Sequence, residues 1–421
     1  MLIKEGNKIK KLLFNISGVW ISEALTLMIL FMIQIFSAKL LGPSDYGLFA
    51  ALNSITTVFT ALSHGVRVAF ARTTADNILK ERQLRFHPGA IRIPLIGGSV
   101  LAILLVLIAP FLFDVLSFSS FQFVLAISLN LPLVLLIFVL MGAVQGTQNF
   151  KLYSLIIIFQ SLIRLMSTFG ILILGFGIGG MLWAIFLTNV VILTFFTPLC
   201  LRSTLINTDY TNMVRISRTN VVQLSFLIVA LLLSLHASAD VFIARNLLDP
   251  DSAGTYALIA ITGKIVLYSP MAIVFVIFPK MVAFGGDVKN VRDIFVKALV
   301  ISCTASLLVS IILFFGIETI VSLIFGPSYT LVPYIVFLYS LGMIVLSINH
   351  QIFSLFLALS VNNKYIYIST CIYTLGFIFI GLVGHSVLKI SASVLIVNLV
   401  VLVMLFPAMI KILFFPKNRN V

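Results

Sequence analysis

Long apolar runs alternate with short polar connections along the whole chain. Each run is long enough to cross about 30 Å of hydrocarbon as a helix, which takes roughly 20 residues. Placing the breaks at charged residues, proline and glycine predicts about twelve membrane-spanning helices and no soluble domain. The predicted spans are residues 12–38, 44–66, 93–116, 121–144, 152–175, 178–200, 219–246, 253–282, 294–317, 329–358, 365–384 and 390–414.

The composition agrees with an all-α polytopic membrane protein. Of the 421 residues, 61% are hydrophobic and only 10% are charged, which is more apolar surface than a soluble fold can bury. The first apolar run is far longer than the core of a signal peptide and lacks a small-residue cleavage site, so we expect no cleavable leader. The three cysteines have no paired spacing and predict neither a disulfide nor a zinc site.

Most of the 27 basic residues fall on one side of the predicted membrane. That side holds both termini and the loop at residues 67–92, whereas the other side holds Lys39, Arg245 and Lys389. Because cytoplasmic loops are enriched in Lys and Arg, we expect both termini in the cytoplasm, which requires an even number of spans. The net charge of +14 then reflects topology, and the absence of a basic soluble module argues against nucleic-acid binding.

A ten-residue motif occurs twice, about half the chain apart. Residues 41–50 read Leu-Gly-Pro-Ser-Asp-Tyr-Gly-Leu-Phe-Ala, and residues 248–257 read Leu-Asp-Pro-Asp-Ser-Ala-Gly-Thr-Tyr-Ala. Both copies lie on the predicted outer side, between spans 1 and 2 and between spans 7 and 8. The chain is therefore predicted to form two parallel-repeat six-helix lobes, residues 1–205 and 206–421, with a site at the seam between them.

The motif combines residues that end one helix and start the next. Pro43 and Pro250 cannot continue a helical hydrogen-bond ladder. Gly47 and Gly254 allow a tight reversal. The polar pair after each proline suits the capping of the following helix, and the aromatic residue two positions after each glycine is expected at interface depth. We interpret both copies as hinges without ligand contact. Pro270, inside span 8, is expected to kink that helix.

Four basic residues in or next to the spans are candidate anion contacts. Arg164 lies near the middle of span 5 and Lys264 near the middle of span 8. Arg67 and Arg72 follow the inner end of span 2. A charge inside a span costs about 2.5–3.5 kcal/mol on insertion scales, and a diphosphate would be met by the planar fork of Arg and the point charge of Lys. The first two could instead form inter-helix ion pairs or contact backbone carbonyl groups, and the last two could be topogenic charges that snorkel to the surface.

Two acids inside predicted spans could bind a coupling ion. Glu23 lies in span 1, and Asp240 lies in the outer half of span 7, one turn after His236. A desolvated carboxylate titrates nearer to neutral pH and can bind a proton or a sodium ion. The alternative is that both acids are counter-ions of the interior cations.

Span 10 carries three consecutive polar residues, Asn349, His350 and Gln351. Their side chains could hydrogen-bond sugar hydroxyls, or they could pack as satisfied polar groups inside the bundle. The chain shows no Ser/His/Asp set, no metal-ligand spacing and no phosphate-cradling glycine loop. We therefore expect neither an enzyme nor a bound cofactor or metal, and only a coupling H+ or Na+ remains as a bound ion.

The first repeat motif, an inner turn and one acid together resemble a known family. They are residues 41–50, the turn Gln145-Gly146-x-x-Asn149-Phe150, and Asp240 ahead of Pro250-x-x-x-Gly254-x-Tyr256. This combination resembles the polysaccharide transporters, the O-antigen and capsule repeat-unit flippases of the multidrug/oligosaccharidyl-lipid/polysaccharide exporter superfamily. The resemblance implies a bacterial inner-membrane protein that moves polyprenyl-diphosphate-linked oligosaccharide from the cytoplasmic to the outer leaflet by alternating access. It also implies contact with membrane lipids, and other polysaccharide assembly proteins are candidate partners.

Other functions stay open on the sequence alone. A cation-coupled multidrug exporter of the same superfamily would be expected to centre on carboxylates in the first half, whereas this interior leans cationic and favours an anionic substrate. A lipid II flippase commonly has two further C-terminal spans. A membrane polysaccharide polymerase or acyltransferase would need a large outer loop or a cluster of His, Asp and Arg, and the predicted outer loops are short.

Overall fold

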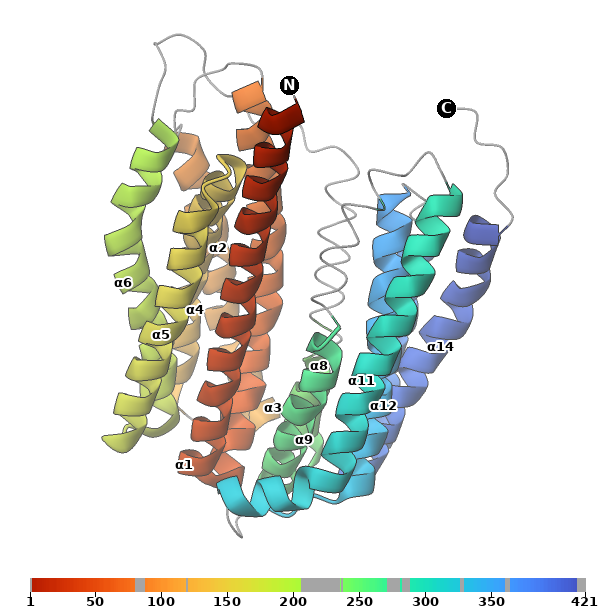
Figure 1. Cartoon of the computed structure of the whole chain (residues 1–421). Helices are drawn as coiled ribbons and strands as arrows, with labels where there is room; N and C mark the ends of the chain where they lie inside the picture. The colour runs from red at the N-terminus through yellow and green to blue at the C-terminus, as the bar shows by residue number, and fades with distance from the viewer. Residues whose placement is uncertain are drawn as a thin grey trace. The chain divides into compact units, whose positions relative to one another are not determined.

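The computed structural model describes residues 2–79, 88–118, 120–205, 235, 238–270, 281, 288–325, 329–359 and 364–414 (Figure 1). Within these ranges all regular elements are helices. Eight of them are long and apolar enough to cross a membrane, or nine with one bent pair. In addition, α1 (Leu2–Leu79) covers two predicted spans, and predicted spans 7 and 8 lie partly outside the described ranges. The fold is thus an all-α polytopic one of about twelve helices, as predicted.

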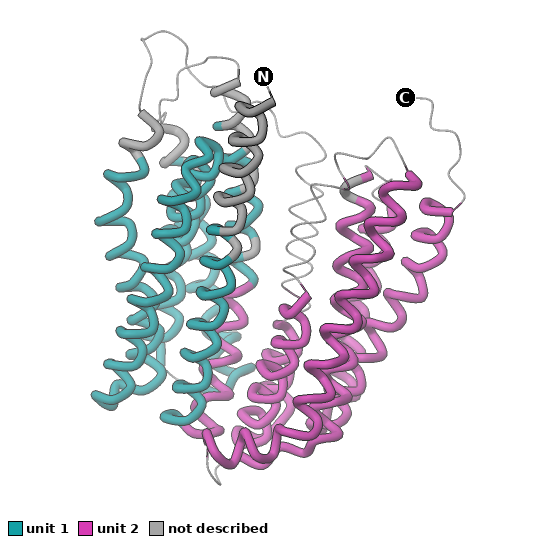
Figure 2. Tube along the Cα trace, viewed as in Figure 1, with its two compact units in different colours: residues 1–41, 58–223 teal, residues 42–57, 224–421 magenta. Residues whose placement is uncertain are grey.

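The chain divides into two compact units, which are described separately here (Figure 2). Unit 1 comprises Met1–Leu41 and Val58–Gln223. Unit 2 comprises Gly42–Thr57 and Leu224–Val421. Helix α1 therefore contributes residues to both units. The predicted lobe boundary after residue 205 falls where the described residues stop, and it stays a prediction.

In unit 1, helix α4 is packed along two neighbours. It lies along α2 and α6, and α5 lies along α6. α1 is interrupted at Gly42, whose φ of 76° suits glycine, directly before Pro43. α2 and α3 meet at a bend of 55°, where Pro110 at the start of α3 cannot continue the preceding ladder. Besides α1, the helices are α2 (Pro88–Leu107), α3 (Ala109–Leu116), α4 (Phe121–Gly146), α5 (Phe150–Ile173) and α6 (Gly177–Leu205).

In unit 2, one helix packs against most of the others. α12 packs along α9, α11 and α14, while α13 packs along α14. α11 extends beyond the predicted span 294–317 at both ends. Besides residues 42–57 of α1, the helices are α8 (Ala239–Leu247), α9 (Pro250–Tyr268), α11 (Val288–Phe325), α12 (Pro333–Ala358), α13 (Lys364–Val383) and α14 (Val387–Phe414).

Small polar residues mark the buried face of α11. Ser302, Ser306 and Ser310 recur every fourth residue and are all buried, while large apolar side chains on other faces of the helix are exposed. Ser306 donates to the carbonyl oxygen of Val266 on α9 at 3.1 Å. Small polar residues between helices and apolar residues outside are the arrangement expected in lipid.

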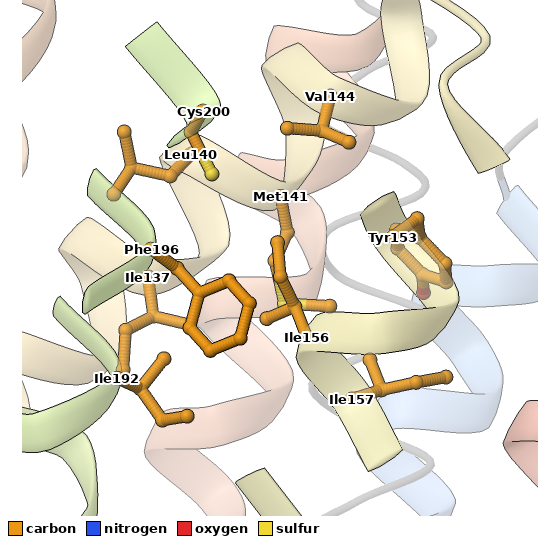
Figure 3. Close-up of a cluster of buried hydrophobic side chains, with 10 residues drawn as sticks. All are labelled: Ile137, Leu140, Met141, Val144, Tyr153, Ile156, Ile157, Ile192, Phe196 and Cys200. Carbon is orange, nitrogen blue, oxygen red and sulfur yellow. The ribbon is translucent and has the colours of Figure 1, made fainter. Parts of the chain in front are cut away.

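An apolar cluster joins α4, α5 and α6 in the core of unit 1 (Figure 3). It buries Tyr153 near the start of α5. A buried tyrosine usually directs its hydroxyl to a polar partner, so one is expected inside this unit. The buried members of the cluster are Ile137, Leu140, Met141, Val144, Tyr153, Ile156, Ile157, Ile192, Phe196 and Cys200.

Two glycines of α4 bring α1 into backbone contact. A Cβ on Gly142 would lie 2.5 Å from the carbonyl oxygen of Arg67, and a Cβ on Gly146 would lie 2.5 Å from that of Ala71. The Gly-x-x-x-Gly spacing places both glycines on one face of α4 and allows the two helices to approach closely. This contact holds the backbone of Arg67 beside α4.

The two copies of the repeated motif pack against each other within unit 2. A Cβ on Gly47 would lie 2.8 Å from the backbone nitrogen of Gly254, and a Cβ on Gly254 would overlap the carbonyl oxygen of Pro43. Arg245 at the end of α8 donates to the carbonyl oxygen of Ser44 at 3.4 Å. The two glycines therefore allow two helices to touch, a role that the turn interpretation did not include.

The cap of α9 comes from a different residue than predicted. Asp249 accepts a hydrogen bond from the backbone N–H of Ser252 at 2.9 Å, so the capping residue precedes Pro250 instead of following it. This bond lowers the pKa of the Asp249 carboxyl, because it stabilises the ionised form. The first copy has Gly42 at the equivalent position and lacks a side chain for the same cap.

Candidate functional site

In unit 1, a tyrosine hydroxyl joins an arginine to a glutamate. The Arg67 guanidinium donates through Nη1 to the Tyr153 hydroxyl, which donates to Oε1 of Glu23 at 2.8 Å. Tyr153 belongs to α5 and is 3% exposed, whereas Arg67 and Glu23 lie on α1, on opposite sides of its break. Over the residues that the structure describes, Arg67 and Glu23 form no direct ion pair. The hydroxyl therefore links two opposite charges that do not touch.

Aromatic rings surround the same guanidinium. Its central carbon lies 5.9 Å from the ring centroid of Phe138 and 5.8 Å from that of Tyr153. His64, three residues before Arg67, meets the ring of Phe138 edge-on at a centroid distance of 4.6 Å. Cation–π contact and hydrogen bonding thus hold Arg67 against its neighbours in unit 1, unlike a side chain that snorkels to the surface.

Three amide side chains connect α4, α5 and α6 elsewhere in unit 1. Gln160 donates to Oδ1 of Asn189 at 2.8 Å, and Asn189 donates to Oδ1 of Asn130 at 2.7 Å. Asn130 and Asn189 are buried. Because an amide both donates and accepts, such a chain can join helices in an apolar environment without adding charge.

Arg164 lies one turn after Gln160 on α5. Its Nε is buried and has no hydrogen-bond partner among the described residues. Ser167, in the next turn, contacts the hydroxyl of Thr188 on α6 at 3.3 Å. No described acid pairs with Arg164, so the ion-pair alternative finds no support in the described part of the chain. The guanidinium retains donor capacity that an anion could use.

In unit 2, two tyrosine hydroxyls converge on one carboxylate oxygen. Tyr256 donates to Oδ2 of Asp240 at 2.8 Å, and Tyr339 donates to the same atom at 2.7 Å. Asp240 is 1% exposed, and its Oδ1 has no partner among the described atoms. The two tyrosine rings meet edge to face, with centroids 5.9 Å apart. Helices α8, α9 and α12 thus supply the acid and its two donors.

Lys264 is a basic residue that interacts with Asp240. It lies two turns after Tyr256 on α9 and interacts electrostatically with Asp240 without a direct ion pair. The counter-ion interpretation of Asp240, with Lys264 as its partner, stays a prediction. The open oxygen Oδ1 is the atom that could take a proton or contact a small cation. Among the described residues, no group of three or more His, Cys, Asp or Glu side chains could hold a metal ion.

The two repeats differ at this position. Tyr256 is the aromatic residue of the second motif, where the first motif has Phe49. By the same spacing, Asp240 corresponds to Ile33. All four side chains are buried, and the interface depth expected of the two aromatic residues stays a prediction. At these two positions the second repeat has a hydrogen-bonded acid and tyrosine, and the first has two apolar residues.

The three polar residues of span 10 point in different directions on α12. Asn349 is fully buried and donates to the hydroxyl of Tyr373 at 3.2 Å and to the carbonyl oxygen of Asn398 at 3.1 Å. Gln351 is 3% exposed, and neither of its amide atoms has a described partner. His350 is buried as well. Asn349 thus serves helix packing, and Gln351 retains unused hydrogen-bonding capacity.

Three predicted positions lie wholly or partly outside the described residues. His236 is not described, and neither is the side chain of Arg72, although its backbone belongs to α1. Pro270 follows the end of α9, and residues 271–280 after it are not described. The kink at Pro270 therefore stays a prediction.

The sequence pattern did not single out Tyr153, Tyr339 or the three amides of unit 1. A tyrosine in an apolar span resembles an interface aromatic residue, and nothing in the sequence pairs Tyr153 with Glu23, which lies 130 residues away. The amides offered a usable signal, because Asn and Gln inside apolar spans tend to hydrogen-bond across helices. Asn130, Gln160 and Asn189 all meet that criterion.

The fold, with its apolar spans and its interior charges and amides, defines a multi-pass helical membrane protein. It is similar to an inward-facing multidrug resistance MATE family transporter of the MOP superfamily, with a TM-score of 0.76 and 15% identity over 94% of this chain and 96% of that chain. The outward-facing conformation of such a transporter gives a TM-score of 0.69 and 15% identity over 95% of each chain.

A third similar structure is a MOP superfamily transporter from Pyrococcus furiosus. The binding pocket of that transporter is described as having reverse polarity, which suggests a different function for it. It gives a TM-score of 0.67 and 14% identity over 94% of each chain. At these identities the similarity establishes the fold. No curated protein matches the sequence.

The sequence itself matches the family described as polysaccharide biosynthesis protein over residues 36–332, which is more than half of the chain. The chain therefore belongs to this family of polysaccharide biosynthesis proteins, and the resemblance noted from its motifs is confirmed.

Proposed function

We propose that the protein is a flippase that moves polyprenyl-diphosphate-linked oligosaccharide repeat units from the cytoplasmic to the outer leaflet by alternating access. The family match supports a role in polysaccharide biosynthesis, and the similar folds belong to transporters. The observation that favours an anionic substrate concerns Arg164, whose buried Nε has no described hydrogen-bond partner. A diphosphate is the kind of group that a guanidinium binds through paired, charge-assisted hydrogen bonds.

Three cations with described surroundings are the proposed diphosphate contacts. Arg67 and Arg164 lie in unit 1, Lys264 lies in unit 2, and each is a candidate for the diphosphate. Arg72 is a further candidate from the sequence. For the sugar, Gln351 is the best of the span-10 residues, because both of its amide atoms lack described partners. Translocation in this proposal breaks no covalent bond, so no residue has a catalytic role.

A second function draws support from Asp240. A buried carboxylate with one open oxygen is suited to a coupling cation, and this feature fits a cation-coupled multidrug exporter of the same superfamily. In the flippase proposal the same residue binds the coupling ion. In either case we place the protein in the bacterial inner membrane with both termini in the cytoplasm.

The proposal is tested in cells that lack the protein. We expect lipid-linked repeat units to accumulate in the inner leaflet, which can be measured by their protection from an impermeant sugar-modifying reagent applied from outside. The wild type should restore export, whereas Arg164→Ala and Lys264→Ala should reduce it at least tenfold, a loss of about 1.4 kcal/mol of stabilisation. The control Lys389→Ala alters an exposed residue and should behave as the wild type.

Two results would contradict the proposal in different ways. Full export by both Arg164→Ala and Lys264→Ala would remove these cations from the substrate site and leave the flippase function standing. No accumulation of repeat units, together with increased drug sensitivity in cells lacking the protein, would favour the multidrug exporter.

A further inference from the structure

Tyr153 links Arg67 to Glu23, and of these three residues the proposed function uses only Arg67. We propose that this triad binds an anionic phosphate group and a proton together: the phosphate contacts the Arg67 guanidinium, and the proton neutralises the Glu23 carboxylate. The inference rests on the proposed function, since it takes the phosphate to be part of the substrate's diphosphate. It adds a coupling step inside unit 1.

The hydrogen bonds explain why an anion alone binds poorly. The single proton of the Tyr153 hydroxyl is directed at Oε1 of Glu23, and the hydroxyl oxygen accepts from Arg67. With Glu23 ionised, the positive and negative charges of the triad cancel. A phosphate that approaches Arg67 then also meets the negative charge of Glu23, and like charges this close repel in a low-dielectric environment.

A proton on Glu23 reverses this balance. The carboxylate loses its charge, its bond from Tyr153 becomes an ordinary neutral hydrogen bond, and Arg67 is left with an uncompensated positive charge. The structure also supplies donors for the incoming anion. Arg67 has five N–H donors, one of which bonds Tyr153, and its buried Nε has no described partner. Proton and anion therefore strengthen each other's binding, and by linkage the effect is reciprocal.

The other titratable groups nearby do not replace Glu23 in this role. His64 precedes Arg67 on α1, and its ring meets that of Phe138 edge to face. A charge on His64 would add to that of Arg67, so it would strengthen anion binding and would not cancel the acid. Lys151, two residues before Tyr153, is exposed. Of the described side chains joined by these hydrogen bonds, Glu23 is the one with a carboxylate, so it is the group that takes up the proton in this proposal.

The packing around the triad does not depend on its charges. The ring of Tyr153 belongs to the apolar cluster of α4, α5 and α6 (Figure 3). The backbone of Arg67 is held where its carbonyl oxygen meets Gly142. Substitutions that keep side-chain shape, such as Glu23→Gln and Tyr153→Phe, are therefore expected to leave the fold intact. Thermal unfolding of each purified variant checks this expectation.

The experiment measures binding of farnesyl diphosphate, with farnesol as the uncharged control, to the purified full-length chain in detergent. Isothermal titration at pH 6, 7 and 8, in two buffers of different ionisation enthalpy, gives both the Kd and the number of protons taken up. The diphosphate itself also ionises over this pH range, but equally for every variant. Its contribution to the pH dependence therefore cancels when each Kd is divided by the Kd of Glu23→Gln at the same pH.

For the wild type, we expect uptake of up to one proton on binding. Its Kd relative to that of Glu23→Gln should rise with pH, by up to about tenfold per pH unit where a whole proton is taken up. Glu23→Gln should bind with high affinity at pH 8 and take up no proton at this site. Glu23→Asp should keep the pH dependence, Arg67→Gln should lose binding at every pH, and Lys389→Ala should match the wild type.

The outcomes separate this inference from the proposed function. If the wild type binds the diphosphate but Glu23→Gln shows the same pH dependence and proton uptake, the linkage is wrong and the flippase proposal stands. If Arg67→Gln binds as well as the wild type, the anion does not use this triad. If the wild type binds no diphosphate at any pH, the proposed function fails and this inference fails with it.

Discussion

Tyrosine hydroxyls bond both interior acids whose contacts the structure describes. Glu23 accepts from Tyr153, and Asp240 accepts from Tyr256 and Tyr339. A phenol donates a hydrogen bond without adding a second charge, so it stabilises a carboxylate while the nearest cation stays out of direct contact. The opposite charge remains able to bind something else.

At the Asp240 site we predict that the two tyrosines act together. Tyr256→Phe or Tyr339→Phe removes one donor and should each destabilise the protein by about 1 kcal/mol, between the averages for interhelical bonds in membranes and for bonds to charged groups. The double variant leaves the buried carboxylate without a tyrosine donor and should cost more than the sum of the two. Unfolding of the purified protein in detergent measures this.

The control for this prediction is built into the repeat. The first motif has Phe49 where the second has Tyr256, and Phe49 is buried. A phenylalanine ring is therefore compatible with that position of the motif. Strictly additive losses in the double variant would mean that the two hydroxyls act independently.

Single residues were predictable from the sequence where charge was the signal. Glu23, Arg67, Arg164 and Asp240 stand out because ionisable groups are rare in apolar spans. Their partners were not predictable, because a tyrosine in an apolar span has several ordinary explanations. Which hydroxyl reaches which acid depends on how helices from distant parts of the chain pack. The structure supplies that information for Tyr153 and Glu23.

At the scale of helices, glycine allows two pairs of segments to approach closely. Gly142 and Gly146 meet the backbone of α1 in unit 1, and Gly47 meets Gly254 in unit 2. The sequence indicated the spans and most of their ends, because hydropathy reports directly on lipid exposure. It assigned Gly47 and Gly254 to turns only, because a close contact requires knowledge of the opposite helix. The bend between α2 and α3 likewise depends on local geometry at Pro110.

We predict that Gly254→Ala is destabilising by about 1–3 kcal/mol, the usual range for overpacking. The new Cβ would overlap the carbonyl oxygen of Pro43, which is backbone and cannot rotate away. The matched control is Gly381→Ala on α13, where no atom lies within 4 Å of the added carbon. That variant should be neutral or slightly stabilised, since alanine favours a helix. Thermal unfolding of both proteins in detergent checks the difference.

Equal stability of Gly254→Ala and Gly381→Ala would show that the contact between the two motifs is not close in the membrane. A loss in Gly254→Ala that Gly47→Ala does not share would show that the contact is asymmetric. The geometry already suggests this, since a Cβ on Gly47 would lie 2.8 Å from its nearest neighbour, whereas a Cβ on Gly254 would overlap one.

At the scale of the whole molecule, the repeat and the charge distribution predict a parallel arrangement. The chain has two compact units, and the similar transporters cover nearly its full length. The number of helices and the fold class were predictable, since both follow from hydropathy and span length. The assignment of residues 42–57 to unit 2 was not predictable from the sequence. These residues are continuous with the rest of α1 in the chain, but they pack with unit 2.

For the topology, we predict that cysteines placed at Ser44 and Asp251 react with an impermeant maleimide added from outside. Both positions belong to the repeated motif and are at least partly exposed. The experiment uses a background without the three native cysteines, and Lys151→Cys is the inner control, which should react only after the membrane is permeabilised. Labelling of Ser44→Cys and Asp251→Cys from opposite sides would rule out a parallel repeat.

The placement of residues 42–57 in unit 2 has a consequence for how the protein is made. This segment is synthesised about two hundred residues before α9, against which Gly47 packs. At translation rates of about 5–20 residues per second, the segment waits roughly 10–40 s for its partner helix. Unit 2 therefore cannot finish folding from the second half of the chain alone. Splitting the gene between the halves would turn an internal folding step into an assembly reaction, whose rate depends on the concentration of both pieces in the membrane.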